Sequence, residues 1–279
     1  MNDFVILSEY FKFDHVSRRK EVLDSIRDNS LLNEVHRIIL FHEEISEDEQ
    51  KLLVDIPKVE LVRVNHRCRY SDLFSYANTH LQNEICIVCN NDISFTNSLG
   101  HLIGSEMDEL FLCLTRWDIK DDGSICLKEP RQSRKHSQDS WVFKSPLPQK
   151  MIDKGTIFFG RPGCDNMIAY LAVVSGLKVL NPSELIVSVH RHLSGKRNYK
   201  QNERGTPASN EKFGHHSLYM NVGTSNSIEY NTENLVYKLQ QAWKPRNKVF
   251  GGDLAVEKCV ELEDALEEIW EQSVSRFKF

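Results

Sequence analysis

Polar residues interrupt an apolar run at Cys89-Asn90-Asn91-Asp92, and this is where the sequence most clearly offers chemistry. The run before it, residues 85–89, is apolar throughout, as expected for a strand covered on both faces. A carboxylate at the carboxyl end of such a strand points into the crevice where open α/β sheets bind ligands. Asp92 could there hold a divalent cation, which would neutralise a diphosphate. Asn-Asn-Asp suits a plain turn equally well.

Asp165 is a second candidate, because it follows the tight segment Gly160-Arg161-Pro162-Gly163-Cys164 and begins a predicted helix over residues 165–175. An aspartate in this place caps the helix or presents a general base at the rim of the crevice. The amides at a helix N-terminus lower the pKa of a nearby carboxyl. We therefore expect Asp165 to be ionised at neutral pH and to be a weak base.

Two histidines and a polar cluster complete the candidates. Side chains alternate along a strand, so His190 and His192 at the end of a predicted strand share one face. An imidazole there could complete a metal site or contact phosphate, and a structural role is the alternative. Asp139 precedes Trp141, and a carboxylate beside an indole suits sugar recognition. A loop that leads into a core strand explains the same residues.

Alternating apolar and amphipathic segments must position these side chains. The patterns predict strands over 4–7, 35–41, 59–64, 85–89, 110–115, 141–143, 157–159 and 186–190. They predict helices over 17–27, 43–53, 70–81, 165–175 and 254–277, the first with Ser17 as its N-cap. Residues 118–138 are expected to form a surface hairpin or loop, and 195–223 a long polar loop. This alternation is typical of an α/β fold with a mainly parallel sheet.

Composition excludes several classes of protein. Among 279 residues, 35 Lys and Arg face 40 Asp and Glu, and the net charge of −5 argues against a nucleic-acid partner. No apolar run approaches the ~18 residues of a membrane span, and the first residues lack the basic region of a signal peptide. Seven scattered cysteines are not a disulfide framework and indicate a reducing, cytoplasmic compartment.

Ten short segments in chain order form a further pattern. They are Ser8-Glu9-Tyr10, Arg67, Tyr70, Asn91-Asp92-Ile93, Arg116-Trp117, Gln138-Asp139-Ser140-Trp141, Gly160 to Asn166, Asn181-Pro182-Ser183, His190-Arg191-His192 and Arg197-Asn198-Tyr199. Together they resemble the GT-A-fold glycosyltransferases, in the branch found in bacteria, algae and large algal viruses. The resemblance covers residues from about 3 to about 200 and implies a GT-A (Rossmann-like) domain over 1–200. Residues 201–279 would form a loop and a C-terminal helical extension packed on the same domain.

The resemblance implies a nucleotide-sugar donor, usually a UDP-sugar, with Mn²⁺ or Mg²⁺ on its diphosphate. The family's metal motif is Asp-x-Asp, and here Asn90 replaces the first carboxylate. Asp92 would then hold the metal with His192. Asp165 matches the base of inverting members, and Asp139 is the second catalytic candidate or an acceptor ligand. The residues implied in nucleotide contacts are Ser8, Glu9, Tyr10, Arg67, Tyr70, Asn91 and Asp92.

The expected acceptor is a glycan or glycoprotein, since some viral enzymes of this branch build capsid glycans, and xylose is one donor sugar that the resemblance suggests. We expect the chain to act as a monomer or homodimer. The alternative is a catalytically inactive sugar- or nucleotide-binding scaffold of the same fold, which the missing carboxylate at Asn90 favours. A sugar-nucleotide pyrophosphorylase would need a glycine-rich loop with a lysine after the first strand, where this chain has Ser8-Glu9-Tyr10-Phe11.

Overall fold

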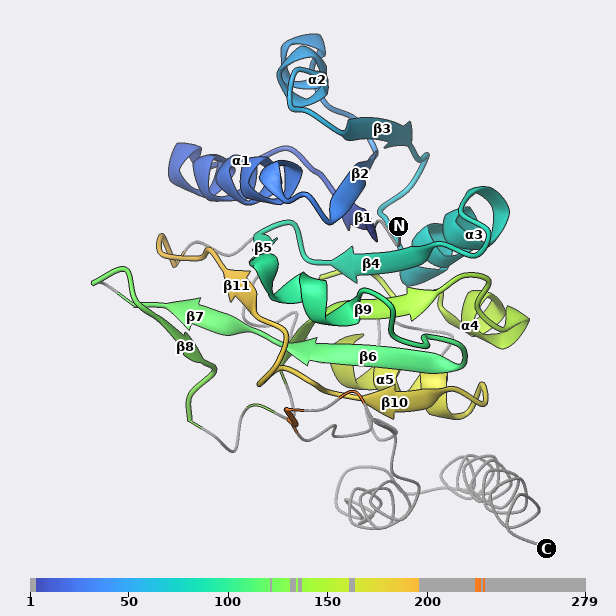
Figure 1. The fold of residues 1–279 in the computed structure, drawn as a ribbon. Coiled ribbons are helices and arrows are strands. Elements are labelled where there is room, and N and C mark those ends of the chain that lie inside the picture. The colour runs from blue at the N-terminus through green and yellow to red at the C-terminus, as the bar shows by residue number, and fades with distance from the viewer. Residues whose placement is uncertain are drawn as a thin grey trace, which may run out of the picture.

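A seven-stranded, mainly parallel sheet forms the centre of the structure, a computed structural model that describes residues 4–120, 122–130, 134, 137–160, 164–195, 224–226 and 228 (Figure 1). The strands lie in the order β10 (Lys178–Leu180), β6 (Leu110–Thr115), β9 (Gln138–Lys144), β4 (Ile85–Cys89), β1 (Phe4–Glu9), β2 (Val35–His42) and β3 (Val59–Arg63). Only β9 is antiparallel to both of its neighbours, β4 and β6. The carboxyl ends of β1, β4 and β6 therefore meet the start of β9 at one edge.

A smaller four-stranded sheet continues from that edge. Its order is β5 (Ile93–Phe95), β11 (Ser188–His190), β7 (Trp117–Ile119) and β8 (Ile125–Leu127). Strand β5 follows β4 after the Asn90-Asn91-Asp92 turn, and β7 follows β6 directly. Figure 1 shows these strands beyond the arrowheads of β4 and β6. The small sheet thus surrounds the place where open α/β sheets bind ligands.

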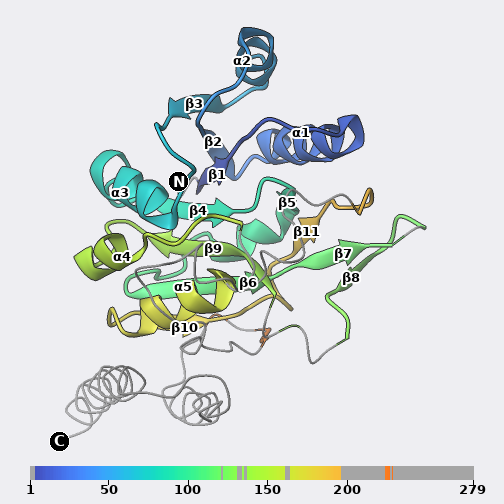
Figure 2. The same cartoon turned by 180° about the vertical axis from the view of Figure 1, so that it is seen from behind.

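Helices cover both faces of the large sheet. Tyr70, Met151 and Met167 of α3 (Tyr70–His80), α4 (Gln149–Lys154) and α5 (Cys164–Val173) belong to one apolar cluster. Figure 2 shows α4 and α5 on this face. On the other face, α1 (Val16–Leu31), α2 (Glu47–Val54) and the short 3₁₀ helix Asn97–Leu102 contribute Leu23, Leu53 and their neighbours to a second cluster. The expected α/β class, a mainly parallel sheet flanked by helices, is confirmed.

The strand sequences divide cleanly between these two clusters. In β4, Cys86 and Val88 face the α3 and α5 side, whereas Ile85, Ile87 and Cys89 face the α1 side. A strand buried on both faces needs apolar residues at every position, and this is what residues 85–89 supply. Cys86 and Cys89 consequently lie on opposite faces, which makes them core residues and not a pair of metal ligands.

Several predicted elements differ in detail from the structure. Helix α1 begins at Val16, and its N-cap residue His15 makes no capping side-chain bond, so Ser17 is inside the helix. Residues 157–159 do not form a strand; Phe158 makes only an isolated bridge with Arg69. The polar residues before Trp141 are themselves part of β9, which starts at Gln138. Strand β10 was not predicted, since only three residues pair with β6.

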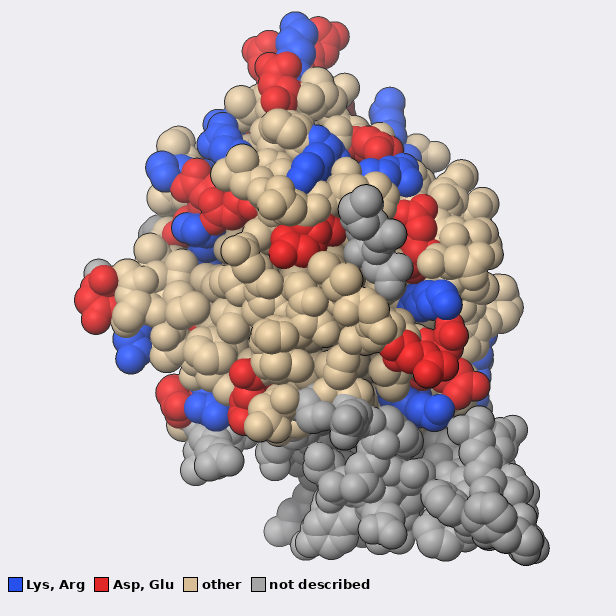
Figure 3. Space-filling model, in the orientation of Figure 1, with Lys and Arg blue, Asp and Glu red and all other residues tan. Residues whose placement is uncertain are grey.

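Other predictions concern residues that the structure does not describe. The helix expected over 254–277, most of the loop expected over 195–223 and the division near residue 200 lie outside the described residues. Within the described part of the chain, no helix has the length and apolar character needed to cross a membrane. The six cysteines described are all free, and five of them are buried. On the face in Figure 3, described basic and acidic side chains lie interspersed, without a broad basic area.

Candidate functional site

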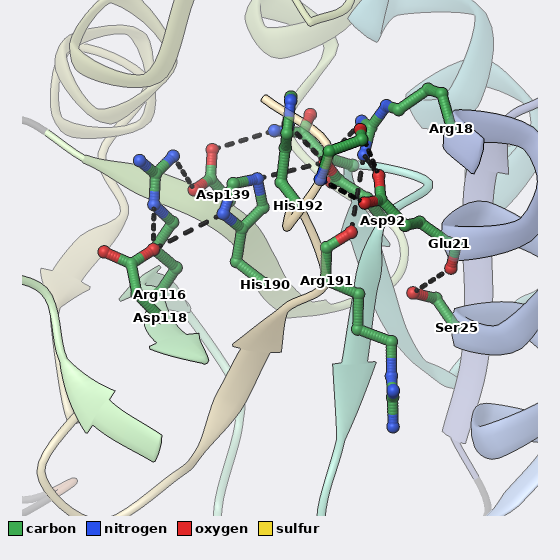
Figure 4. A network of polar contacts seen from close by, with 12 residues as sticks. Arg18, Glu21, Ser25, Asp92, Arg116, Asp118, Asp139, His190, Arg191 and His192 are labelled. Carbon is green, nitrogen blue, oxygen red and sulfur yellow. Dashed lines mark hydrogen bonds and ion pairs between the residues drawn. The ribbon is translucent and has the colours of Figure 1, made fainter. Parts of the chain in front are cut away.

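Asp92 lies at the centre of a buried polar group, directly after the carboxyl end of β4 (Figure 4). Strand β11 pairs antiparallel with β5, which places His190 opposite Ile93 and brings both histidines back to the turn. The Oδ2 atom of Asp92 lies 3.0 Å from Nε2 of His190 and 3.6 Å from Nδ1 of His192. The prediction that the two imidazoles share one face is confirmed by these distances.

Asp92, His190 and His192 could hold a metal ion. One ligand atom from each residue lies within 4.8 Å of the other two. Oδ1 of Asp92 and Nε2 of His192 are buried and have no hydrogen-bond partner among the described residues, and a ligand would supply one. Two imidazole nitrogens and one carboxylate suit a divalent transition ion better than Mg²⁺, which prefers oxygen ligands. The predicted pair of Asp92 and His192 is thus brought together, with His190 as a third donor.

Positive groups determine the charge state of this centre. Burial opposes ionisation of Asp92, but His190, His192 and Arg18 outweigh it and hold the pKa of the Asp92 carboxyl well below its usual range. Burial also opposes protonation of His190, yet the Asp92 carboxylate and the bond to Asp118 raise the pKa of His190 to about 9. The imidazole of His190 is therefore cationic at neutral pH when no metal is bound.

A second set of charges lies beside the first. Arg116, which follows β6, pairs with Asp118 at 3.0 Å and with Asp139 at 2.9 Å. Asp139 also accepts a hydrogen bond from Nδ2 of Asn90 at 2.8 Å. Both carboxylate oxygens of Asp139 are therefore occupied. Asn90 uses its amide nitrogen here, and its Oδ1 atom is buried with no partner in the described segments.

Asp165 lies in the first turn of α5, half-buried and close enough to Asp139 for their charges to interact. Burial and then the Asp139 charge raise the pKa of Asp165 to about 7, although the backbone amides of Asn166, Asp165 and Gln138 lower it. The expectation that Asp165 is fully ionised at neutral pH is wrong. The helix amides act as predicted, but desolvation and a second carboxylate outweigh them.

The residues predicted to contact a nucleotide have mixed placements. Tyr10 and Tyr70 are fully buried: Tyr10 donates to Glu49, and the Tyr70 hydroxyl lies 3.3 Å from Sγ of Cys164. Ser8 is also buried and donates to the carbonyl of Cys89 at 2.7 Å. These placements do not support contacts with a nucleotide, because each polar group already has a partner within the core.

The other nucleotide-contact candidates lie nearer the edge of the sheet. Glu9 and Asn91 are largely buried beside the carboxyl ends of β1 and β4. Arg67 is half-buried, with its guanidinium carbon 5.8 Å from the centre of the Phe158 ring. Trp141 is fully buried and packs edge-on against Tyr70, so the core interpretation of this indole is confirmed.

Sequence reasoning did not identify Arg18, Asp118 or Lys128 as members of the site. Arg18 on α1 donates to Oδ2 of Asp92 at 2.5 Å, and Lys128 of the β8 hairpin pairs with Asp118 at 3.0 Å. In the sequence Arg18 is one basic residue in a polar helix, and no local pattern distinguishes it from Arg19 or Lys20. Its role follows only from the way α1 packs against β5.

Comparisons with known proteins find resemblance at the level of solved structures. No family model matches the chain, and no curated protein matches its sequence. A mannosyltransferase from Pyrobaculum calidifontis, PcManGT, in complex with GDP-Man and Mn²⁺ is similar with a TM-score of 0.43 and 14% identity over 70% of this chain. TarS of S. aureus is similar with a TM-score of 0.45 and 8% identity over 68% of this chain. The chain spans 58% and 37% of the lengths of these two proteins.

A 4-diphosphocytidyl-2C-methyl-D-erythritol synthase from Anaerococcus prevotii is similar with a TM-score of 0.44 and 14% identity, over 77% of this chain and 99% of that one. All three TM-scores lie below 0.5. They assign the chain neither to a family nor to a reaction, and the function has to be argued from the site itself.

Proposed function

We propose that this chain is a GT-A-type glycosyltransferase that moves a sugar from a nucleotide-diphosphate donor to a hydroxyl group of a glycan. The observation that carries the proposal is the group formed at the carboxyl edge of the sheet. There a His-His-Asp set suited to a divalent cation lies beside two interacting carboxylates, one of which has a pKa of about 7. Transfer to a hydroxyl needs both a positive centre for the leaving diphosphate and a base for the acceptor.

Asp92 and His192, with His190, are the residues that would hold the cation. Their nitrogen-rich set favours Mn²⁺ over Mg²⁺. When bound there, the cation would stabilise the charge that develops on the donor's diphosphate. Arg18 and Arg116 bring further positive charge to the same edge.

Asp165 is the proposed base, which takes the proton of the acceptor hydroxyl in a reaction with inversion. A base works best when its pKa lies near the operating pH, and burial gives Asp165 a pKa of about 7. Asp139 is less suited to proton transfer, because Arg116 and Asn90 occupy its two oxygens. Its role is to bind and orient the hydroxyl of a ligand and to raise the basicity of Asp165.

The donor we propose is a UDP-sugar, with UDP-xylose among the candidates, and the acceptor a glycan or glycoprotein. Within the part of the chain that the structure describes, Oδ1 of Asn90 and Oε1 of Gln138 are buried acceptors without partners, and sugar hydroxyls would donate to them. We further propose that this chain belongs to the viral branch that builds capsid glycans. It would act in the cytoplasm as a monomer or homodimer.

A specific contact favours the second candidate, an inactive sugar- or nucleotide-binding protein of the same fold. Oδ2 of Asp92, the oxygen that both imidazoles approach, already accepts a hydrogen bond from Arg18, and Asn90 offers no second carboxylate. An active enzyme should slowly hydrolyse its donor without an acceptor, whereas an inactive protein should only bind it.

The test is a thermal-shift series of nucleotide sugars with and without Mn²⁺, followed by donor hydrolysis. We expect one donor to raise the melting temperature, since a ligand at about 100 times its Kd adds about 2.7 kcal/mol of stability. Mn²⁺ should enlarge the shift, and Asp92→Asn should abolish the enlargement. Asp153→Asn, a change of an exposed carboxylate on α4, is the matched control.

The outcomes separate the candidates. A shift with accompanying hydrolysis supports the transferase. A shift without hydrolysis supports the binding protein. If no donor shifts the melting temperature and none is hydrolysed, the transferase proposal is wrong.

A further inference from the structure

Arg18 is a buried arginine whose direct contact with Asp92 the proposed reaction does not require. It lies in the first turn of α1 and is 7% exposed. Its Nη2 atom donates to Oδ2 of Asp92 at 2.5 Å, and its Nη1 atom lies 3.2 Å from Glu21 and 3.5 Å from the carbonyl of Arg191. Figure 4 shows the guanidinium on the α1 side of Asp92, opposite His190.

The oxygen that Arg18 contacts is the one that both histidines approach. Oδ2 of Asp92 is 3.0 Å from His190, 3.6 Å from His192 and 2.5 Å from Arg18. A divalent cation that takes Oδ2 together with the two imidazoles would share that oxygen with the guanidinium. Two positive groups a few ångströms apart in a buried place repel each other strongly, because little water screens them.

We propose that Arg18 is a built-in competitor of the metal ion, which occupies Asp92 in the metal-free protein and has to release it when a divalent cation binds. The inference rests on the metal site of the proposed function. It makes Arg18 a positioning residue that sets the affinity of the site, without being a metal ligand itself.

Glu21 is an alternative ion-pair partner for Arg18. It lies one helical turn further along α1 and already pairs with Arg18 at 3.2 Å. Glu21 is itself fixed, because it accepts hydrogen bonds from the amide and hydroxyl of Ser194 at 2.6 and 3.0 Å. A small rotation of the guanidinium from Asp92 toward Glu21 would therefore keep Arg18 paired while the carboxylate binds metal.

The experiment is a titration of the full chain with Mn²⁺, in which electron paramagnetic resonance measures the free ion. Arg18→Met removes the competing charge and keeps most of the side-chain volume. Because Arg18→Met no longer holds the carboxylate by a charged hydrogen bond, we expect the Kd for Mn²⁺ to fall about tenfold or more. Arg18→Lys retains the charge and should bind Mn²⁺ much as the unchanged chain does.

Two further variants make the test decisive. Arg27→Met removes an exposed arginine from the same helix and should leave the Kd unchanged. Arg18→Gln keeps a polar partner for Glu21 and replaces Arg18→Met if circular dichroism shows that the latter does not fold. Because the readout is metal binding, no donor, acceptor or turnover is needed.

The results also separate this inference from the proposed function. Tighter binding in Arg18→Met or Arg18→Gln, including binding seen only in these variants, supports the competition. If both variants bind Mn²⁺ as tightly as the unchanged chain or more weakly, the proposed role of Arg18 is wrong, while the metal site remains supported. Absence of Mn²⁺ binding in every variant overturns the metal site and the competition together.

Discussion

Replacing Asp165 by asparagine removes one charge from a half-buried position in the first turn of α5, and the effect on stability follows from its pKa. In the folded protein, burial and the Asp139 charge raise that pKa from 3.8 to about 7. The folded state therefore keeps this proton to higher pH than the unfolded state does. The resulting stabilisation is complete below the unfolded pKa and is lost as the pH rises through about 7.

The magnitude follows from the size of this rise. A pKa increase from 3.8 to about 7 corresponds to about 4 kcal/mol once the pH exceeds both values. A little over half of this develops between about pH 5 and about pH 8. Asp165→Asn should thus be more stable than the unchanged chain, and its advantage should be about 2 kcal/mol larger at the higher pH.

The assay is urea unfolding at the two pH values, followed by the fluorescence of buried Trp141 and the other tryptophans. Asp153→Asn changes an exposed carboxylate on α4 and controls for the loss of charge itself. The same variant tests the catalytic role: turnover should fall about 10²-fold or more while donor binding survives. In the unchanged chain, turnover should rise with pH to a plateau above about 7.

An advantage of Asp165→Asn that is absent, or that shrinks as the pH rises, would refute the reasoning, because the carboxyl would then not be desolvated in the folded state. A turnover that survives in the variant would refute the base and leave the pKa argument intact.

Three further predictions concern the packing around the site, each measured by urea unfolding. Asn29→Ala should lower the free energy of unfolding by about 1 to 3 kcal/mol, since Asn29 donates to Ile93 at 2.9 Å and accepts from Phe95 at 2.8 Å. A loss of less than half of this would mean that water replaces the Asn29 side chain. Phe143→Ala should cost about 3 to 5 kcal/mol, because the ring is fully buried, and Phe143→Leu should recover most of that. Arg116→Met should cost about 3 kcal/mol by leaving the buried carboxylate of Asp139 without its cation, whereas Asp118 keeps its pair with Lys128, and a neutral result would show that Asp139 takes up a proton instead.

The sequence predicted the large elements where pattern and burial agree. Residues 85–89 are apolar at every position and form β4, and 70–81 matches α3, Tyr70–His80, because its apolar face has helical spacing. The sequence pattern misplaced an element boundary where the local residues supply neither a buried position nor a capping side chain. Helix α1 starts at an exposed valine, Val16, with no capping side chain.

The candidate site could be predicted only in part. Asp92, Asp139, His190 and His192 end or begin strands, so topology alone brings them to one edge. The pKa of Asp165 could not be predicted, because it depends on desolvation and on Asp139, which belongs to another element. Tyr10 follows β1 and Tyr70 begins α3, places where ligand contacts are common, yet the structure buries both rings. Aromatic residues at such positions serve the core as readily as a ligand.

The antiparallel strand β9 has a consequence for the order in which the protein folds. Strands β1, β2 and β3 pair with their neighbours in the sequence through helical crossovers, and such contacts close quickly. Strand β9 has to enter between β4 and β6, where it pairs Ile85 with Lys144 and Phe111 with Phe143. Asp139 reaches Arg116 and Asn90 only after this insertion. We therefore expect Asp139 and Asp165 to come together late in folding. The backbone amides of β9 should accordingly gain protection from hydrogen exchange after those of β1 and β2.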